Sequence, residues 1–352
     1  MMGEIMKDNV KWGVIASGGI ARRRTIPEGI IPSANASLVS VYDSRADTNG
    51  EVANEFGAHP AESVQELLDG DIDAVYVASP VNKHLEHVMA CAEAKKHVLC
   101  EKPLGMTVEE AEQMIGKCER EGVLLGTGLM MRFLAQHREA HRLIREGKLG
   151  KPVYGRAQLS CWYPKMEGAW RQDPLTGGGG SLIDMGSHCI DLLEMFMGRV
   201  KSLNCYIGNN VQNYKSEDSA VVLLLFEDGG MATVDAFFCI PDNSSKNALE
   251  LYGSRGSILA RGTIGQGEEG AMTAFLEDDL QDYDSQQARS NGDGLVISPE
   301  PVNMYRAEIE EFCNAVLEGR DPVNSAQVGL RNQKLLAACY ESARTGRQVI
   351  VN

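Results

Sequence analysis

The chain has 352 residues, 43% hydrophobic and 24% charged, and a formal net charge of −15 at pH 7. Its length exceeds that of most single domains and predicts two domains with separate cores. The negative charge argues against nucleic acid as a partner, because phosphates need basic patches. The sequence offers no run of about 18 apolar residues as a membrane span and no signal region in Met1 to Asn9, so we expect a cytoplasmic protein.

The nine cysteines form no C-x-x-C pair and lie mostly in apolar runs. That pattern is typical of reduced core thiols and indicates no disulfide framework.

An alternation of strand and helix patterns fills the first 130 residues. An apolar run, 10–16, breaks at Ser17-Gly18-Gly19 and resumes as a helical pattern. Further apolar runs that read as buried strands are 37–42, 74–78, 97–100 and 123–128, with helical patterns between them at 51–56, 83–95 and 108–121. Such alternation predicts an α/β fold with a doubly wound parallel sheet.

The first turn of such a sheet places backbone N–H groups against a pyrophosphate. The dinucleotide fingerprint G-x-G-x-x-G appears here as Ala16, Gly18 and Ala21, so its first position departs from the pattern. We expect Ala16, Ser17, Gly18, Gly19 and Ile20 to contact the cofactor.

Asp43 ends the second strand, 25 residues after Gly18. A carboxylate there would accept the ribose hydroxyls of an adenosine and so favours NAD over NADP. Ser44 and Arg45 leave NADP open, because a hydroxyl and a guanidinium can hold a 2′-phosphate. A simple strand-ending turn is the other interpretation of Asp43.

Two strands are followed by polar loops, Ser79-Pro80 and Glu101-Lys102-Pro103. Both loops fall on the carboxyl edge of the sheet, where ligands of open α/β folds bind. Lys102 is therefore a candidate active-site cation. The following X-Pro bond can be cis at modest cost, and a fixed Lys102-Pro103 turn would direct the lysine into a cleft. A solvated loop lysine is the alternative.

Asp184 and His188 lie four residues apart, just after the four glycines 177–180. On a helix this spacing puts both side chains on one face, and glycines let another molecule approach the backbone. An acid-base pair beside an accessible stretch of backbone suggests catalysis. A surface or helix-capping pair is the alternative interpretation.

The segment 137–141, His-Arg-Glu-Ala-His, has two histidines at metal-ligand spacing, but its glutamate is displaced from the H-E-x-x-H arrangement. We expect a solvated amphipathic helix and no metal.

The second half of the chain changes character. An apolar strand pattern lies at 153–161. From about 201 to 259 the pattern is strand-like, for example at 219–226 and 231–240, which a tight turn joins, and it predicts antiparallel sheet; 263–301 reads as loops between short strands. Helical patterns at 304–317 and 328–345 predict structural packing against the first domain. We expect domains at 1–130 and 131–352, with their junction near 128–133.

Taken together, the glycine turn, Ser79-Pro80 with His84, the run 97–104 around Glu101-Lys102-Pro103, and 184–191 resemble the Gfo/Idh/MocA oxidoreductases. This is the family of glucose-fructose oxidoreductase, inositol dehydrogenase and 1,5-anhydrofructose reductase. The resemblance runs over nearly the whole chain. It implies an N-terminal Rossmann domain and a C-terminal α/β domain with a large, mostly antiparallel open sheet that forms a dimer or tetramer face.

The resemblance also implies roles for individual residues. Members use the matching lysine, aspartate and histidine around the carbinol carbon, which here are Lys102, Asp184 and His188. Trp170 and Arg171 resemble the cofactor-proximal pair of the anhydrofructose reductase branch. The remaining expected cofactor contacts are Ser79, Pro80, Asn82, His84, Glu101 and Lys102. The expected substrate contacts are Lys102, Arg132, Trp162, Tyr163, Asp184, His188 and Asp191. At 130–133 this chain lacks the asparagine that many relatives have before the arginine.

Oxidising a secondary alcohol needs a base and orientation from the protein, since the nicotinamide takes the hydride. An imidazole titrates near neutral pH, so His188 is the expected base. Asp184 would bind the substrate hydroxyl or hold the imidazole, and Lys102 would stabilise alkoxide charge or relay a proton. We therefore expect an NAD(P)-dependent sugar or polyol oxidoreductase. The alternatives are a glycosidase that uses NAD for transient oxidation, and a non-catalytic NAD(P)-binding regulator.

Overall fold

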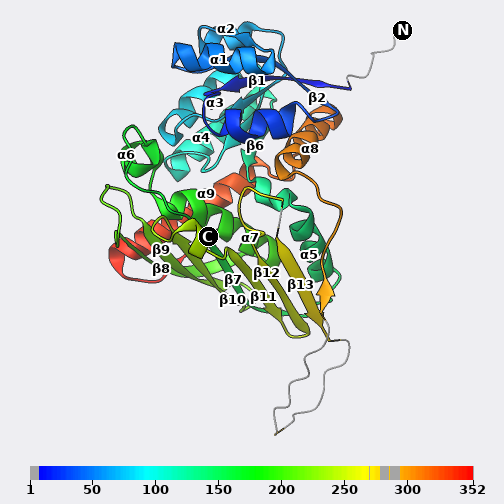
Figure 1. Ribbon diagram of the computed structural model, residues 1–352, viewed down its shortest axis with the longest axis vertical. Coiled ribbons are helices and arrows are strands. Elements are labelled where there is room, and N and C mark those ends of the chain that lie inside the picture. The colour runs from blue at the N-terminus through cyan, green and yellow to red at the C-terminus, as the bar shows by residue number, and fades with distance from the viewer. Residues whose placement is uncertain (1–7, 269, 278–284, 286–293, 352) are drawn as a thin grey trace. The chain divides into compact units, whose positions relative to one another are not determined.

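The computed structural model describes residues 8–268, 270–277, 285 and 294–351. Its contacts divide the chain into two compact units (Figure 1). The first unit comprises Met1–Met130, Leu175–Gly178 and Asn303–Lys334. The second comprises Met131–Pro174, Gly179–Val302 and Leu335–Asn352.

The first unit contains a six-stranded sheet in the order β3-β2-β1-β4-β5-β6, and each of its strand pairs is parallel. The strands are β1 Val10–Ile15, β2 Ala36–Tyr42, β3 His59–Pro60, β4 Ala74–Val77, β5 His97–Glu101 and β6 Leu125–Gly128. The predicted doubly wound parallel sheet is confirmed. The two-residue β3 escaped prediction because it is too short to show a hydrophobic pattern.

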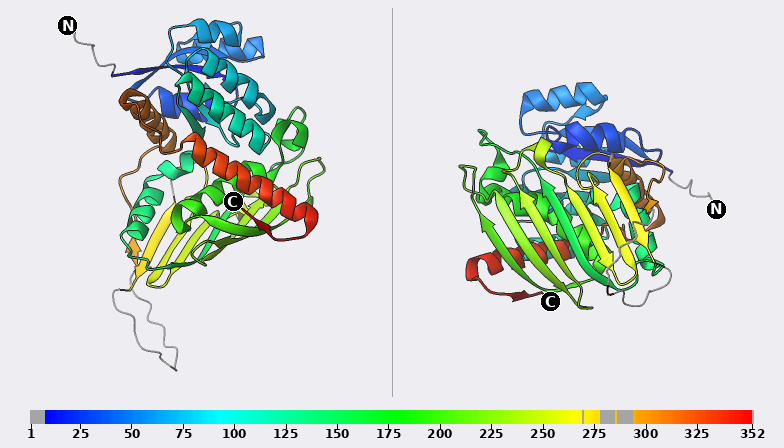
Figure 2. Two further views of the ribbon diagram at one scale, coloured as in Figure 1. Left: turned by 180° about the vertical axis from the view of Figure 1, so that it is seen from behind. Right: turned by 60° about the horizontal axis from the view of Figure 1, so that its bottom comes forward.

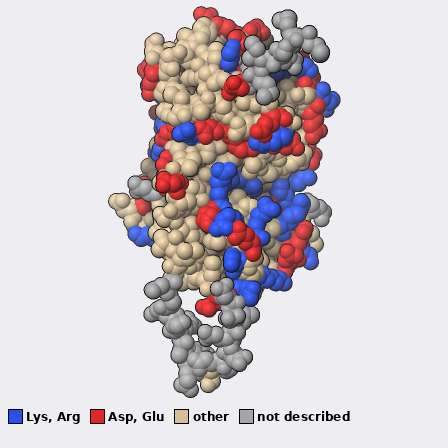
Figure 3. Space-filling model, turned by 90° about the vertical axis from the view of Figure 1, so that its right-hand side faces the viewer, with Lys and Arg blue, Asp and Glu red and all other residues tan. Residues whose placement is uncertain are grey.

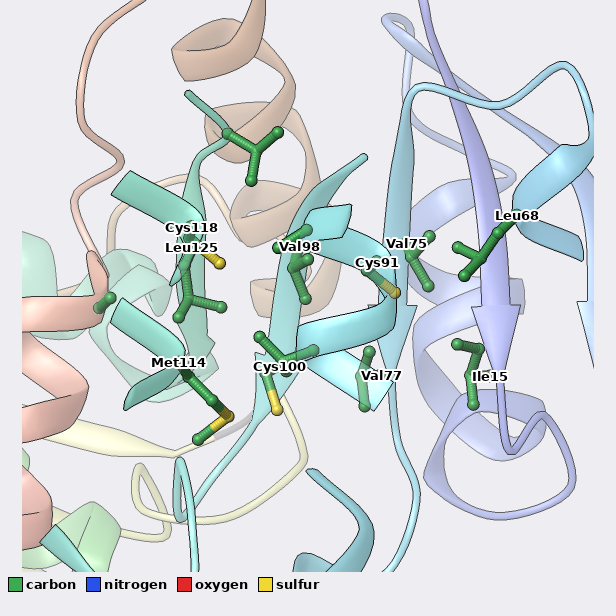
Figure 4. Close-up of a cluster of buried hydrophobic side chains, with 14 of the residues drawn as sticks. Ile15, Leu68, Val75, Val77, Cys91, Val98, Cys100, Met114, Cys118 and Leu125 are labelled. Carbon is green, nitrogen blue, oxygen red and sulfur yellow. The ribbon is translucent and has the colours of Figure 1, made fainter. Parts of the chain in front are cut away.

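Helices cover both faces of this sheet, because alternate residues of its strands are buried on opposite sides. Val75 and Val77 join a core with α3 and α4, drawn in Figure 4, whereas Ala74 and Tyr76 join a second core with α8 and a π-helix. The helices of this unit are α1 Ala46–Phe56, α2 Val64–Asp69, α3 His84–Glu93, α4 Val108–Glu121, α8 Met304–Glu318, the π-helix Ala21–Ile30 and the 3₁₀ turn Val81–Lys83.

All nine cysteines are free, as predicted. Cys91, Cys100 and Cys118 belong to the core drawn in Figure 4. Burial raises the pKa of the Cys118 thiol to about 12, so it stays protonated and packs as a small apolar side chain.

The second unit contains a nine-stranded sheet in the order β14-β13-β12-β11-β7-β10-β9-β8-β15. Its strands are β7 Pro152–Ser160, β8 Val200–Gly208, β9 Ser219–Phe226, β10 Met231–Phe237, β11 Ala248–Gly253, β12 Gly256–Arg261, β13 Ala271–Leu276, β14 Leu295–Val296 and β15 Val349–Ile350. Within the described strands only β7 and β10 pair in parallel, so the mostly antiparallel sheet is confirmed.

One face of this sheet carries α7, and the opposite face is open in the right-hand view of Figure 2. At Gly155 in β7, an added Cβ would lie 2.4 Å from the Met197 sulfur, so glycine lets α7 pack against the strand. The helical segments with residues in this unit are α5 Ala135–Arg145, α6 Pro174–Gly177, α7 Ser187–Met197, α9 Ala326–Thr345, the π-helix Leu182–Gly186 and the 3₁₀ turns Met130–Phe133, Trp170–Gln172 and Asp242–Ser244.

The predicted loop region 263–301 contains β13 and β14, and the part of it at 269, 278–284 and 286–293 lies outside the described residues. Among the helices that the structure describes, none combines the length and hydropathy needed to cross a membrane.

Candidate functional site

The turn after β1 has the conformation expected of a dinucleotide-binding turn. Ala16 takes a left-handed backbone with φ of 62°. The N–H groups of Ala16 and Ser17 both donate to the Tyr42 carbonyl, at 2.7 and 3.1 Å, which ties the turn to the end of β2. The sequence departs from glycine at the one fingerprint position where this backbone favours it.

Gly18 is packed against the end of β2. Its N–H donates to Asp43 Oδ2 at 2.9 Å, and an added Cβ would lie 2.4 Å from the Thr48 methyl group. Asp43 Oδ1 accepts from the Arg45 N–H at 3.1 Å and lies 3.3 Å from Arg45 Nε. Asp43 therefore braces the turn, a role that was not predicted for it, and Arg45 belongs to the same cluster.

The turn suits a nucleotide cofactor by two criteria. An added Cβ at Gly19 would meet nothing within 4 Å, so the backbone there is open to close approach. The Ser17 hydroxyl is buried and has no hydrogen-bond partner among the described residues. An unpaired buried hydroxyl costs free energy unless a ligand or water satisfies it. Ser17, Gly19 and the N-terminus of the following π-helix are thus the groups that would hold a pyrophosphate.

His84 links the two loops at the carboxyl edge of the sheet. Its Nε2 lies 2.9 Å from the Ser79 carbonyl, and its Nδ1 lies 3.0 Å from the Pro103 carbonyl. Burial lowers the pKa of His84 to about 4, which keeps the ring neutral at physiological pH. Both ring nitrogens lie against backbone carbonyls, so His84 helps to position the two loops. His87 Nδ1 reaches the Ser79 hydroxyl at 2.9 Å.

Glu101 ends β5, and the Lys102–Pro103 peptide bond is cis. The Lys102 N–H donates to Glu101 Oε2 at 3.2 Å, while the Tyr76 hydroxyl donates to Glu101 Oε1. These contacts give Glu101 a part in holding the backbone of the lysine loop.

A second carboxyl group, Glu308 on α8, is buried near Glu101 and was not singled out from the sequence. Asn324 Nδ2 donates to its Oε1 at 2.9 Å. Burial, and then the charge of Glu101, raise the pKa of Glu308 well above its ordinary value. A glutamate in an amphipathic helix with several other glutamates gives no sequence signal for this arrangement, because it brings together residues 207 positions apart.

Asp184 and His188 lie on one continuous helical segment, as predicted. The segment begins as the π-helix Leu182–Gly186 and continues as α7. The imidazole of His188 is buried, at 6% exposure. Asp184 Oδ1 accepts from Arg171 Nε at 3.0 Å, so the carboxylate has a cationic partner.

Four residues predicted for the site lie together in the second unit. The Arg171 guanidinium carbon is 4.2 Å from the centre of the Trp170 ring, a cation–π contact. Burial raises the pKa of the Tyr163 phenol, while the nearby charge of Arg171 lowers it and that of Asp184 raises it, so both charged groups lie close to this ring. Trp162 precedes Tyr163 and is exposed. Trp170, Arg171, Tyr163 and Asp184 thus form one polar and aromatic cluster.

Arg132 and Asp191 are partners of one another. Nε and Nη2 of the arginine each lie 2.7 Å from a carboxylate oxygen, and the two side chains are 14% and 4% exposed. This bidentate buried pair joins the turn Met130–Phe133 to α7. It was not anticipated, because substrate contact had been expected of each residue separately.

The sequence predicted that the glycine tract leaves room for another molecule beside the backbone. At Gly179 and Gly180 other residues of this chain occupy that room. An added Cβ at Gly179 would lie 1.8 Å from the Tyr340 hydroxyl, and one at Gly180 would lie 2.0 Å from the Glu217 carbonyl oxygen. The interpretation of Gly179 and Gly180 as an opening for another molecule is therefore wrong. Tyr340 and Glu217 come from distant positions, which the sequence could not reveal.

The segment 137–141 lies in the amphipathic helix α5, as expected, with Arg138, Arg142 and Arg145 exposed and His137 on its buried face. His137 is fully buried, its Nδ1 lies 2.8 Å from the Met131 carbonyl, and burial lowers its pKa to about 4. The rings of His137 and His141 pack against Phe196, with centres 6.0 and 6.4 Å from its centre. Among the described residues, no group of three or more His, Cys, Asp or Glu side chains could hold a metal ion.

Residues 10–129 match the oxidoreductase family with an NAD-binding Rossmann fold, and residues 137–259 match the GFO/IDH/MocA C-terminal domain. The chain is 29% identical over 343 residues to a 1,5-anhydro-D-fructose reductase of Ensifer adhaerens, covering 96% of this chain and 97% of the relative. It is 28% identical to a myo-inositol 2-dehydrogenase of Thermotoga maritima, covering 94% and 96%.

A solved structure of levoglucosan dehydrogenase in complex with NADH and levoglucosan has the same fold, with a TM-score of 0.84. The identity is 21%, and the alignment covers 97% of this chain and 99% of that one. The protein thus belongs to the Gfo/Idh/MocA oxidoreductase family and carries its NAD(P)-binding Rossmann domain.

Proposed function

We propose that this protein transfers a hydride between a nicotinamide cofactor and a secondary hydroxyl or ketone of a sugar, glycoside or cyclitol. The observation that carries the proposal is the helical segment with Asp184 and His188, whose carboxylate is paired with Arg171 beside Tyr163. Relatives named for anhydrofructose and inositol chemistry support the same substrate class.

The chain's residues would act on one carbinol group. His188 takes the hydroxyl proton during oxidation and returns it during reduction, because an imidazole exchanges protons near neutral pH. Asp184, paired with Arg171, holds the imidazole or the substrate hydroxyl in position for that transfer. Lys102 stabilises the developing alkoxide charge as a cation. NAD(P), when bound, supplies the hydride acceptor or donor.

Substrate orientation would fall to the aromatic residues Trp162 and Tyr163, which offer ring faces to a sugar. Arg132 and Asp191 are bound to each other, so we propose that they contact the substrate as a pair. The remaining N–H groups of the guanidinium and the remaining lone pairs of the carboxylate would form hydrogen bonds with it.

We propose NAD as the preferred cofactor, with NADP as the alternative. The anionic Asp43 at the end of β2 would repel a 2′-phosphate and accept ribose hydroxyls. Arg45 already lies beside the same carboxylate, and its side chain is 68% exposed. To bind the 2′-phosphate of NADP, the Arg45 side chain would have to rotate away from Asp43. Ala16, Ser17, Gly18, Gly19, Ile20, Ser44, Ser79, Pro80, Asn82, Glu101, Lys102, Trp170 and Arg171 complete the proposed cofactor contacts.

We further propose that the protein forms a homodimer or homotetramer through the open face of the nine-stranded sheet. Alternate residues on central and outer strands expose apolar side chains: Leu223, Met231, Tyr252 and Phe275. Residues between them in sequence, such as Leu224 and Ala232, are buried on the side that carries α7. An apolar sheet face of this kind marks an association surface.

The test is a turnover screen of sugars, glycosides and inositols with NAD and NADP in parallel, followed at the absorbance of NADH. We expect Lys102→Ala and His188→Ala each to lower kcat about 10²- to 10⁴-fold while NADH fluorescence titrations show cofactor binding largely intact, with a weaker Kd only in Lys102→Ala, which also loses a proposed cofactor contact. Wild-type turnover in both variants would refute the site. Glycoside cleavage without net NADH formation would instead identify the transient-oxidation alternative.

A further inference from the structure

Three hydrogen bonds converge on one oxygen at the start of the helical segment that carries Asp184 and His188. The N–H groups of Gly180 and Leu182 donate to Glu217 Oε1 at 2.8 and 3.1 Å. The Tyr340 hydroxyl donates to the same oxygen at 2.9 Å. These backbone N–H groups at a helix start have no partner within the helix, so Glu217 supplies one.

The backbone of Glu217 contributes a fourth bond, because the Ser181 N–H donates to its carbonyl at 3.0 Å. Glu217 is thus bound to three consecutive residues, Gly180 to Leu182, by its side chain and main chain together. It lies two residues before β9, an interior strand of the nine-stranded sheet, so the helix start is fastened to the sheet.

The contacts of Glu217 with Tyr340 and with residues 180–182 are called here the Glu217 clamp. Gly179 and Gly180 leave the space that this clamp needs. With any side chain at 179, the Tyr340 hydroxyl would have to move, and with any side chain at 180, the Glu217 carbonyl would have to move. The nearer contacts, at 1.8 and 2.0 Å from an ideal Cβ, exclude even alanine without a shift of the surrounding structure.

The electrostatics of the clamp favour a well-ordered site. Glu217 is 6% exposed, and burial raises the pKa of its carboxyl group while the donors from Tyr340, Gly180 and Leu182 lower it. Burial and the neighbouring carboxyl group raise the pKa of Tyr340 well above its ordinary value, so its hydroxyl stays protonated and donates. A buried acceptor with three donors has little freedom to move.

We propose that Glu217, held by Tyr340, is a positioning residue for the reaction: it sets the placement of the helical turn from which Asp184 and His188 reach the substrate. This inference rests on the proposed function, since it assigns the clamp a purpose in the same site. A displacement of about 1 Å at reacting groups can cost on the order of 10²-fold in rate.

The test compares four variants with the wild-type enzyme on the best substrate of the turnover screen. Glu217→Ala removes the acceptor, and Tyr340→Phe removes one donor only. Glu217→Gln keeps a carbonyl oxygen in place of Oε1, the atom that accepts all three bonds. Glu227→Ala, in the exposed turn between β9 and β10, is the matched control.

We expect Glu217→Ala to lower kcat about 10- to 100-fold and Tyr340→Phe to lower it several-fold, with substrate KM and NADH Kd within about twofold of wild type. Glu217→Gln should restore most of the lost kcat, and Glu227→Ala should match wild type. Should Glu217→Ala fail to fold, Tyr340→Phe decides the question by the same measurements.

Two results overturn the inference: wild-type kcat in Tyr340→Phe and Glu217→Ala, or a Glu217→Gln variant that is folded yet as impaired as Glu217→Ala. His188→Ala, measured alongside, separates this outcome from a failure of the proposed function. If His188→Ala retains turnover, the catalytic assignment falls. If it loses turnover while the clamp variants do not, only the positioning role falls.

Discussion

At the scale of single residues, two residues near the expected site have conformations or surroundings that cost free energy: Ala16 in the turn after β1 and Glu308 on α8, beside Glu101. Ala16 has a left-handed backbone, and Glu308 is a carboxyl group buried beside another one. Such costs persist where the surrounding structure imposes them, and they cluster at functional sites. Each of the two residues yields a measurable expectation.

Replacing Ala16 by glycine should raise the free energy of unfolding by about 0.5–1 kcal/mol. Relief of the left-handed backbone contributes about 1–2 kcal/mol, and the greater freedom of glycine in the unfolded chain offsets part of it. Urea unfolding measures the change. Ala53→Gly, within α1, is the control and should lose about 1 kcal/mol. A loss of stability in Ala16→Gly would contradict the assigned strain.

Glu308 should make stability depend on pH. Its pKa in the folded protein is raised above the ordinary 4.5 by burial and then by Glu101, with Glu311 adding to the effect. Below the unfolded pKa both states are protonated and the carboxyl group has no effect. As the pH rises above it, unfolding releases a proton, so stability falls by up to about 1.4 kcal/mol per pH unit until the folded pKa is reached.

Glu308→Gln should remove this dependence and become progressively more stable than wild type as the pH rises from about 4.5. Unfolding by urea at a series of pH values measures the difference between the two proteins. Glu227→Gln is the control, because that side chain is 61% exposed. A difference that stays constant with pH would show that Glu308 titrates normally.

At the scale of elements, the order of strands and helices followed from sequence periodicity, but the reason for the glycine tract did not. Apolar runs and glycine turns identified β1, β2, β4, β5 and β6, because each strand is buried on both faces. The tract 177–180 was interpreted as an opening, and its Gly179 and Gly180 instead receive Tyr340 and Glu217. A glycine indicates close approach without indicating what approaches.

The pair formed by Arg132 and Asp191 makes the same point about charged residues. Each was a candidate substrate contact when considered alone. Their bidentate bond, which joins the turn Met130–Phe133 to α7, gives them a structural task that spacing in the sequence did not suggest. The partner of a buried charge is settled only by the fold, because the two residues are 59 positions apart.

At the scale of the whole molecule, the charge of −15 is unevenly distributed. Lysine and arginine gather over the second unit on the face in Figure 3, and α5 carries exposed Arg138, Arg142 and Arg145. The open sheet face of the same unit exposes apolar side chains beside the ion pairs Arg156–Asp235 and Arg261–Glu250. Association through that face would bury apolar surface that otherwise contacts water.

Replacing Leu223 by glutamate should therefore lower the molar mass measured by light scattering after gel filtration, because it places a charge within the proposed interface. Ile31→Glu, at an apolar side chain of equal 50% exposure in the first unit, is the control and should leave the mass unchanged. A wild-type protein that is already monomeric, or a Leu223→Glu variant of wild-type mass, would contradict the proposed interface.

The sequence by itself determined the alternating α/β order, the antiparallel second sheet, the free cysteines and the family, since each depends on local periodicity or on short motifs with their own residue requirements. Tertiary structure alone decided which side chains meet: Asp43 with Gly18, Arg132 with Asp191, Glu217 with the start of the π-helix. Contacts between residues far apart in the chain arise from packing, and no local pattern encodes their partners.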